Sequence, residues 1–470
     1  MSMVVQHNMQ AANANRMLGI TSGAQAKSTE KLSSGYKINR AADDAAGLTI
    51  SEKMRKQIRG LDKASSNAQD GVSSVQTAEG ALTEVHSMLQ RMNELAVQSA
   101  NGTNSSDDRQ AIQDEVDQLT TEIDRVAETT KFNEIYLLKG DNSNTKNVYM
   151  KGHDAGLKGT LTDGAKSATF TMDALQAGDK YTIAGKEYTI GSATTEVTAL
   201  IDKANTDATA DTANKTVDVN GKTYTITYNA AGNTIADADG TAITLDNLKK
   251  AVTGGSKVTY GNTSLTAMTD ADTDGVDDDD SSIITKDVAE TKIKAELLTA
   301  NNIGTVDQAA TVEDANTANG KTSYTINKGY ATVADTLSFN LHVGADADMT
   351  NKITVDIDTM NSANLGIKGI NVKDASGTEA TYAIDAIADA VAKVSSQRSA
   401  LRAVQNRLEH TIDNLDNISE NTSSAESRIR DTDMAKEMVN YSKNNILAQA
   451  GQSMLAQANQ SNQGVLSLLQ

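Results

Sequence analysis

The 470-residue sequence predicts a mainly α-helical protein that carries an α+β insert. Three observations lead to this fold class. Apolar and small residues recur in alternating steps of three and four near both ends of the chain, which is the pattern of packed helices. The middle is rich in Thr, Asp, Gly and Val and carries hairpin signals. Only 38% of residues are hydrophobic and 3% aromatic, which favours thinly packed helices over one thick core.

The first long helix is predicted to begin near Leu61, and its three-and-four spacing runs without interruption as far as Ser99. Asn101 and Gly102 are expected to end this helix because both tolerate the left-handed conformation. The helix is therefore predicted to bury one continuous seam and to stop before residue 103.

A second and a third helix follow the same rule. Ser105 and Asp108 match a capping box, so a second helix is expected to begin there and to run antiparallel to the first. Residues 384–415 carry the same spacing and are predicted to pack as a third helix against the first two. The two sequence ends then meet in one multi-helix rod.

The outermost segments, residues 3–35 and 432–470, have imperfect apolar periodicity and little charge. Each helix alone buries too little surface to offset its ordering entropy. We therefore expect these segments to be disordered in the monomer and to fold when they associate. The apolar residues predicted to mediate this polymerisation are Val5, Met9, Ile20, Met434, Met438, Ile446, Met454, Leu466 and Leu469.

The middle of the chain predicts hairpins and short helices. The strongest hairpin signal is Asn220-Gly221 between alternating strands in residues 216–227. Residues 180–190 and 323–329 look like relatives of that hairpin. Helices are expected over residues 196–204 and 245–252. The insert is therefore predicted to repeat a hairpin-plus-helix module.

Composition excludes several classes of function. A net charge of −19 and a pI near 4.7 argue against nucleic-acid binding and against an anionic membrane surface. No apolar run approaches the roughly 18 residues of a spanning helix, and the first residues do not resemble a secretory signal peptide. The absence of Cys removes disulfides and thiolate chemistry. The five His residues are scattered and no catalytic motif is present, so an enzyme is not expected.

One acidic loop has the spacing of a calcium site. Its carboxylates occupy positions 1, 3, 5 and 9 of a calcium loop, with Gly275 at position 6. Position 12, where a bidentate Glu belongs, is Ser281. A solvated acidic loop is the favoured alternative. The candidate ligands are Asp270, Asp272, Asp274 and Asp278.

Both ends of the sequence resemble bacterial flagellin. The resemblance rests on long motifs in the family's order, and it covers about half of the chain. Near the start they are LSSGYKINRAADDAAGLTI (residues 32–50), QDGVSSVQTAEG (69–80) and ELAVQSANGT (94–103). Near the end they are QNRL (405–408), AESRIRD (425–431) and MLAQAN (454–459).

The resemblance implies a three-part organisation. Residues 1–44 with 430–470 would form an inner-tube coiled coil, and 45–140 with 337–429 a rod domain with a β-hairpin. Residues 141–336 would form the surface-exposed variable α+β region, inserted ahead of the rod hairpin.

The implied function is that of a secreted subunit that polymerises into the flagellar filament for swimming. Export would run unfolded through the flagellar type III apparatus, with a chaperone on the C-terminal segment. Further partners would be other copies of the chain, the filament cap, hook-associated proteins and host Toll-like receptor 5. The family's receptor epitope maps onto Gln90, Arg91, Leu95, Gln98 and Glu115. Asn93 stands where relatives with the strongest epitopes carry Arg, which argues against strong receptor binding. Contacts between packed subunits would also account for the residue types at the five epitope positions.

Two alternatives remain open at this point. A hook–filament junction protein shares helical ends with flagellin but does not polymerise. Alternatively, the outer region of a flagellin also acts as an adhesin. Elongation of filament seeds by the purified monomer separates the junction protein from the filament subunit.

Overall fold

The computed structural model describes residues 8–270 and 273–467. Contacts divide the chain into two compact units. The first comprises Met1–Gln76, Phe339–Val355 and Arg402–Gln470, and the second Thr77–Ser338 and Asp356–Leu401. Two long helices, α2 (Ala45–Ser99) and α8 (Thr378–Arg430), contribute residues to both units. The fold is helical at both sequence ends and strand-rich between them, as predicted.

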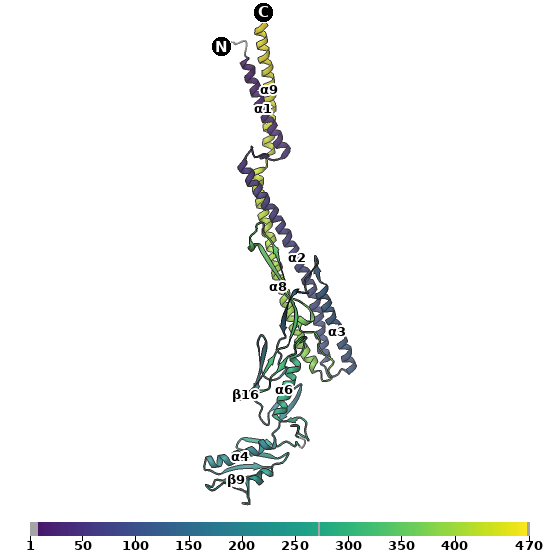
Figure 1. The fold of residues 1–470 in the computed structure, drawn as a ribbon, viewed down its shortest axis with the longest axis vertical. Coiled ribbons are helices and arrows are strands. Elements are labelled where there is room, and N and C mark those ends of the chain that lie inside the picture. The colour runs from purple at the N-terminus through teal and green to yellow at the C-terminus, as the bar shows by residue number, and fades with distance from the viewer. Residues whose placement is uncertain (1–7, 271–272, 468–470) are drawn as a thin grey trace. The chain divides into compact units, whose positions relative to one another are not determined.

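The first unit contains the terminal helices α1 (Met9–Ser34) and α9 (Met434–Ser467), which lie side by side and antiparallel (Figure 1). Asn8 caps α1 by accepting a hydrogen bond from the Ala11 amide, and its side-chain amide donates to the Ala458 carbonyl at 3.3 Å. Gly35 ends α1 in the left-handed conformation at φ 77°, which a residue with a Cβ rarely adopts. The pairing is thereby held at both of its ends.

A β-hairpin packs on the helices of the first unit. Its strands are β19 (Leu337–His342) and β20 (Lys352–Ile357), joined through the short helix η1 (Met349–Asn351). The hairpin contributes Val343 and Ile353 to a small buried cluster with Ala68 and Leu408. Gly71 of α2 is needed there, because a Cβ at that position would lie 2.2 Å from the Leu341 side chain. The predicted hairpin is therefore present and follows the strand-rich middle of the chain, whereas its assignment to a rod domain stays a prediction.

The second unit contains the C-terminal part of α2, α3 (Ser106–Thr129) and the N-terminal part of α8. The predicted capping box is confirmed, since the Ser105 side chain and the Asp108 side chain each bond the other's backbone amide. The predicted seam is also confirmed. Its fully buried members in this unit include Leu82, Val85, Leu89, Met92, Ile123, Ile387 and Val394.

The predicted left-handed end of α2 is wrong. Neither Asn101 nor Gly102 has a positive φ. Side chains bond the last carbonyls in place of a left-handed turn. Asn104 donates to the Gln98 carbonyl, and buried Arg109 donates to the Ser99 carbonyl at 3.4 Å. These donors satisfy acceptors that an αL turn would otherwise satisfy.

The strand-rich part of the second unit begins after α3. A two-stranded ribbon of β3 and β18 leads into it, and a five-stranded and a three-stranded sheet lie beside α6. The elements are β1 (Lys131–Phe132), β2 (Ile135–Tyr136), β3 (Asp141–Tyr149), β4 (Thr160–Asp163), β5 (Ser167–Asp173), β6 (Lys180–Ile183), β7 (Lys186–Ile190), β14 (Ile283–Ile284), α6 (Lys286–Asn301), β15 (Thr311–Val312), β16 (Asn316–Ala318), β17 (Lys321–Asn327), β18 (Tyr330–Asp335) and α7 (Ser362–Leu365).

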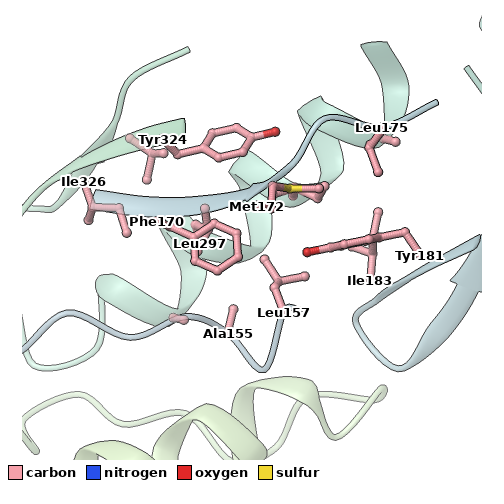
Figure 2. Close-up of a cluster of buried hydrophobic side chains, with 14 of the residues drawn as sticks. Ala155, Leu157, Phe170, Met172, Leu175, Tyr181, Ile183, Leu297, Tyr324 and Ile326 are labelled. Carbon is pink, nitrogen blue, oxygen red and sulfur yellow. The ribbon is translucent and has the colours of Figure 1, made fainter. Parts of the chain in front are cut away.

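One core holds these sheets and α6 together. Figure 2 shows Phe170 and Tyr324 on neighbouring strands, with Leu297 of α6 beneath them. All three side chains are fully buried. Burying such a side chain contributes about 1.5–3 kcal/mol relative to leaving it exposed. This part of the chain therefore buries its apolar side chains in a core of its own.

A separate six-stranded sheet is inserted in the chain between β7 and β14. Its six antiparallel strands run β11-β10-β9-β8-β12-β13, and α4 contacts three of them, β8, β9 and β12. Its core includes Val197, Ile201, Val217, Ile226 and Val258. The elements are α4 (Thr194–Ala210), β8 (Lys215–Val219), β9 (Lys222–Thr227), β10 (Thr234–Asp237), β11 (Ala242–Ile243), α5 (Leu245–Lys250), β12 (Lys257–Tyr260) and β13 (Thr263–Thr266).

Two of the three predicted hairpins are confirmed. Asn220 and Gly221 both have positive φ between β8 and β9, and β6 pairs with β7 across Ala184 and Gly185. The predicted helices over residues 196–204 and 245–252 coincide with α4 and α5.

The third hairpin is correct only in its strand. Residues 323–329 supply most of β17, but the turn precedes them at Asn319-Gly320, where both φ values are positive. After Gly329 the chain pairs with β3 and not with β17. An Asn-Gly pair suits a two-residue turn because it tolerates two left-handed residues.

Candidate assembly surface

The paired helices α1 and α9 bury small and polar residues against each other. Within α1, only Ser28 is buried, and no α9 residue as far as residue 461 is buried. A row of partly buried positions spaced three and four apart runs along α9, and its members are Tyr441, Asn444, Ala448, Gly451, Leu455 and Ala458. A Cβ at Gly451 would lie 3.3 Å from the Leu18 side chain. The contact between the two helices is therefore close but removes little apolar surface from water.

Most of the larger apolar side chains of the same helices are exposed, although Leu18 and Leu455 lie in the contact. Met9, Met17 and Ile20 of α1 are 72%, 54% and 60% exposed. On α9 the exposed apolar residues are Met434, Met438, Val439, Ile446, Leu447 and Met454. Exposed apolar residues gathered on one element mark a surface that another molecule covers.

The structure brings six of the nine predicted polymerisation residues onto this surface. They are Met9, Ile20, Met434, Met438, Ile446 and Met454. Val5 and Leu469 lie outside the described residues, and the Leu466 side chain is likewise outside the description. Met17, Val439 and Leu447 were missed. Helical spacing could have found them, because Met17 is three residues from Ile20 and Val439 seven from Ile446.

The five predicted receptor residues do not share one environment. Gln90, Arg91 and Gln98 are exposed on α2, and Arg91 pairs with Glu115 of α3 at 2.9 Å. Side-chain hydrogen bonds raise the pKa of the Arg91 guanidinium, the bond to Glu115 contributing most and the bond to Glu94 less. Leu95 is only 2% exposed. Its side chain lies in the helix seam, so its part in the predicted receptor site stays a prediction from the sequence.

The acidic loop shows only part of the predicted calcium geometry. Asp270 accepts a hydrogen bond from the Gly275 amide at 3.1 Å, and Asp274 from the Val276 amide at 2.8 Å. Asp272 lies outside the described residues. Within the described part of the chain, no group of three carboxylate or imidazole side chains is placed to hold a metal ion. The calcium site, with Asp278 as its fourth ligand, stays a prediction from the sequence.

Two family descriptions match the ends of the chain. Residues 5–143 match the bacterial flagellin N-terminal helical region, and residues 384–469 match the bacterial flagellin C-terminal helical region. A flagellin from Clostridium tyrobutyricum is 40% identical over 467 residues, covering 98% of this chain and all of that protein. The chain belongs to the bacterial flagellin family. A flagellin from Salmonella rubislaw is 35% identical over 505 residues and is also covered completely.

Membership of the flagellin family, which is a family of structural proteins, makes the chain a structural subunit of the flagellar filament. The solved structure of FliC from Burkholderia pseudomallei is 18% identical in sequence, and its alignment covers 72% of this chain and 99% of the FliC chain. Its TM-score of 0.29 is too low to support a structural argument. Among the described residues, no helix of this flagellin combines the length and apolarity that crossing a bilayer requires.

Proposed function

We propose that the chain polymerises into the filament through the outward apolar faces of α1 and α9. The observation that carries this proposal is an inverted pattern of burial. Small and polar residues such as Ser28 and Ala448 face the partner helix, whereas Ile20, Ile446 and Met454 face solvent. A helix normally buries its apolar face within its own domain. In α1 and α9 the apolar face is instead available to bind other copies of the chain.

The energetics favour ordering on assembly. Two helices joined by a seam of small residues gain little hydrophobic stabilisation, which scales at roughly 25 cal/mol per Å² of buried apolar surface. Fixing each residue costs about 1–2 kcal/mol of backbone entropy. Neighbouring copies that cover Met438, Val439 and Ile446 supply the missing burial. Disorder of these segments before assembly stays a prediction.

Seeded elongation tests the proposal. Short filament fragments are incubated with purified monomer, and filament length is followed by electron microscopy. The wild-type chain is expected to elongate the seeds, whereas Val439→Asp is not, because it places a charge on the apolar face of α9. Val306→Asp is the matched control, since Val306 is 45% exposed in the second unit. Wild-type monomer that fails to elongate seeds would instead favour a hook–filament junction protein.

The same exposed helices fit export in an unfolded state through the flagellar type III apparatus. A chaperone that covers Met438, Ile446 and Met454 would keep α9 from aggregating before export. Hook-associated and cap proteins would meet the same faces at the filament ends. Co-purification of the chaperone with wild-type chain, and its loss with residues 431–470 deleted, tests this part.

Recognition by Toll-like receptor 5 is proposed for the exposed residues Gln90, Arg91, Gln98 and Glu115. The Arg91–Glu115 ion pair spans α2 and α3 and presents a rigid charged patch. Arg91→Ala is expected to lower receptor activation. The matched control is Arg125→Ala, which also removes an exposed ion-paired arginine but lies away from these residues. Equal activation by both variants would contradict the assignment.

A further inference from the structure

Lys393 of α8 is a half-buried lysine whose amine bonds neutral acceptors. Its Nζ donates to the Asn364 carbonyl at 2.6 Å and to the Asn364 side-chain oxygen at 3.0 Å. Both acceptors are neutral. Among the described residues no carboxylate forms an ion pair with it. A buried ammonium without a counterion is costly, and the neutral amine is correspondingly favoured.

The charged groups around Lys393 do not offset this cost. Lys146 of β3 adds a second cation, and it already binds the nearby Asp358 carboxylate at 2.8 Å. Asp389, one helical turn before Lys393, binds Lys151 at 2.8 Å and lies 3.5 Å from His153. Burial lowers the pKa of the Lys393 ammonium to about 8, with Asp358 acting against this change and Lys146 reinforcing it.

A cavity gives small molecules access to this amine. It holds about 250 Å³, and its lining includes Lys393, Asn364 and Asp389 together with the apolar residues Val148, Ile303 and Leu365. Desolvated lysines in such surroundings are the nucleophilic lysines of enzymes that form Schiff bases.

We propose that Lys393 is the amine at which small aldehydes preferentially modify the folded chain. The Nζ lone pair forms a bond to the carbonyl carbon, and the carbonyl oxygen takes up protons and leaves as water. The product is an imine at Nζ. Hydride from an added borohydride reduces the carbon–nitrogen double bond and makes the product stable to analysis.

Competitive reductive alkylation tests the proposal. The full chain is treated at pH 7 with a trace of acetaldehyde and cyanoborohydride, and each lysine is quantified by peptide mass spectrometry. A pKa near 8 leaves about a tenth of an amine neutral at pH 7, against about 0.03% for an ordinary lysine. Lys393 is expected to react at least about tenfold faster than exposed Lys373, with restricted access included. Labelling at or below the rate of Lys373 would overturn the proposal.

Asn364→Asp provides the matched variant. It keeps the size of the side chain but places a carboxylate against Nζ, which stabilises the ammonium. Labelling of Lys393 at pH 7 is then expected to fall to the level of Lys373, while circular dichroism reports an unchanged fold. Fast labelling that persists in the folded variant would also overturn the proposal. The reactivity of Lys393 would then not depend on the neutral Asn364 oxygens that accept its hydrogen bonds. In urea the wild-type rates of the two lysines are expected to converge.

Discussion

The terminal helix pair and the inserted six-stranded sheet use apolar residues in opposite ways. In the insert, Val197, Ile201 and Ile226 are fully buried between α4 and the sheet. In the terminal pair, Ile20, Ile446 and Met454 are mostly exposed, and the helix contact is made by smaller residues. The insert therefore completes its own core. In the assembly that we propose, other copies of the chain cover the exposed apolar side chains of the terminal helices.

Removing residues 431–470 is expected to have the largest effect. Assembly should be lost completely, because α9 and most of the exposed apolar surface are removed. The helices of the second unit and the inserted sheet should keep their circular dichroism and melting temperature, since they bury their own cores. A truncated chain that still elongates seeds would break the comparison.

A pair of isoleucine truncations compares the two regions directly. Ile201→Ala should lower the free energy of unfolding of the insert by about 2–5 kcal/mol, because it leaves a cavity in a packed core. Ile446→Ala should change monomer stability little, since Ile446 is 66% exposed, yet it should slow elongation. Urea unfolding and seeded assembly, measured on both variants, give the two readouts. Loss of monomer stability in Ile446→Ala would show that the helix pair is self-contained.

A pH series measures how much the half-buried Lys393 ammonium lowers the free energy of unfolding of the second unit. The folded pKa of about 8 lies below the ordinary lysine value, so the unfolded chain binds more protons between pH 8 and about 10.5. The free energy of unfolding contributed by this group therefore rises as pH increases through that window. Relative to Lys393→Met, the wild-type chain should gain about 2 kcal/mol between pH 7.5 and 10. Parallel pH profiles of the two proteins would exclude a buried charged amine.

The smallest predicted effect concerns local capping of α3. Ser105→Ala removes one side of the capping box and should destabilise the second unit by about 1 kcal/mol. Ser105→Thr keeps the hydroxyl and should cost less. Thermal melts followed at 222 nm measure the difference, and seeded assembly should not change. An assembly defect in Ser105→Ala would mean that the α2–α3 connection also contributes to subunit contacts.

The helices and turns that depend on local chemistry were predictable. The seam through Leu82 and Leu89, the capping box at Ser105 and the Asn220-Gly221 turn each follow from spacing or from residue type at adjacent positions. The end of α2 was not predictable in the same way. It depends on Arg109 and Asn104 reaching carbonyl groups several residues away, which the local sequence does not encode.

The assembly surface could be predicted in part. Periodicity located the apolar residues of α1 and α9, but it did not show which of them face the partner helix. Leu455 turned out to be in the seam, whereas Met454 beside it is 65% exposed. The helix α6 was missed, although Ala289, Ile293 and Leu297 recur every four residues. The burial of Leu95 was not predictable from the family motif, which does not distinguish a buried position from an exposed one.

The place where the six-stranded sheet joins the rest of the second unit has an evolutionary consequence. β7 and β14 are parallel neighbours, with Ile190 opposite Ile284, and the Gly191 amide donates to the Ile284 carbonyl at 2.9 Å. The chain therefore leaves for residues 191–282 and returns from them at adjacent points of one sheet. A segment anchored in this way can be exchanged as a cassette, since a replacement needs only two neighbouring ends. Natural sequence variation and the deliberate insertion of foreign domains can both use this position without altering the terminal helices α1 and α9.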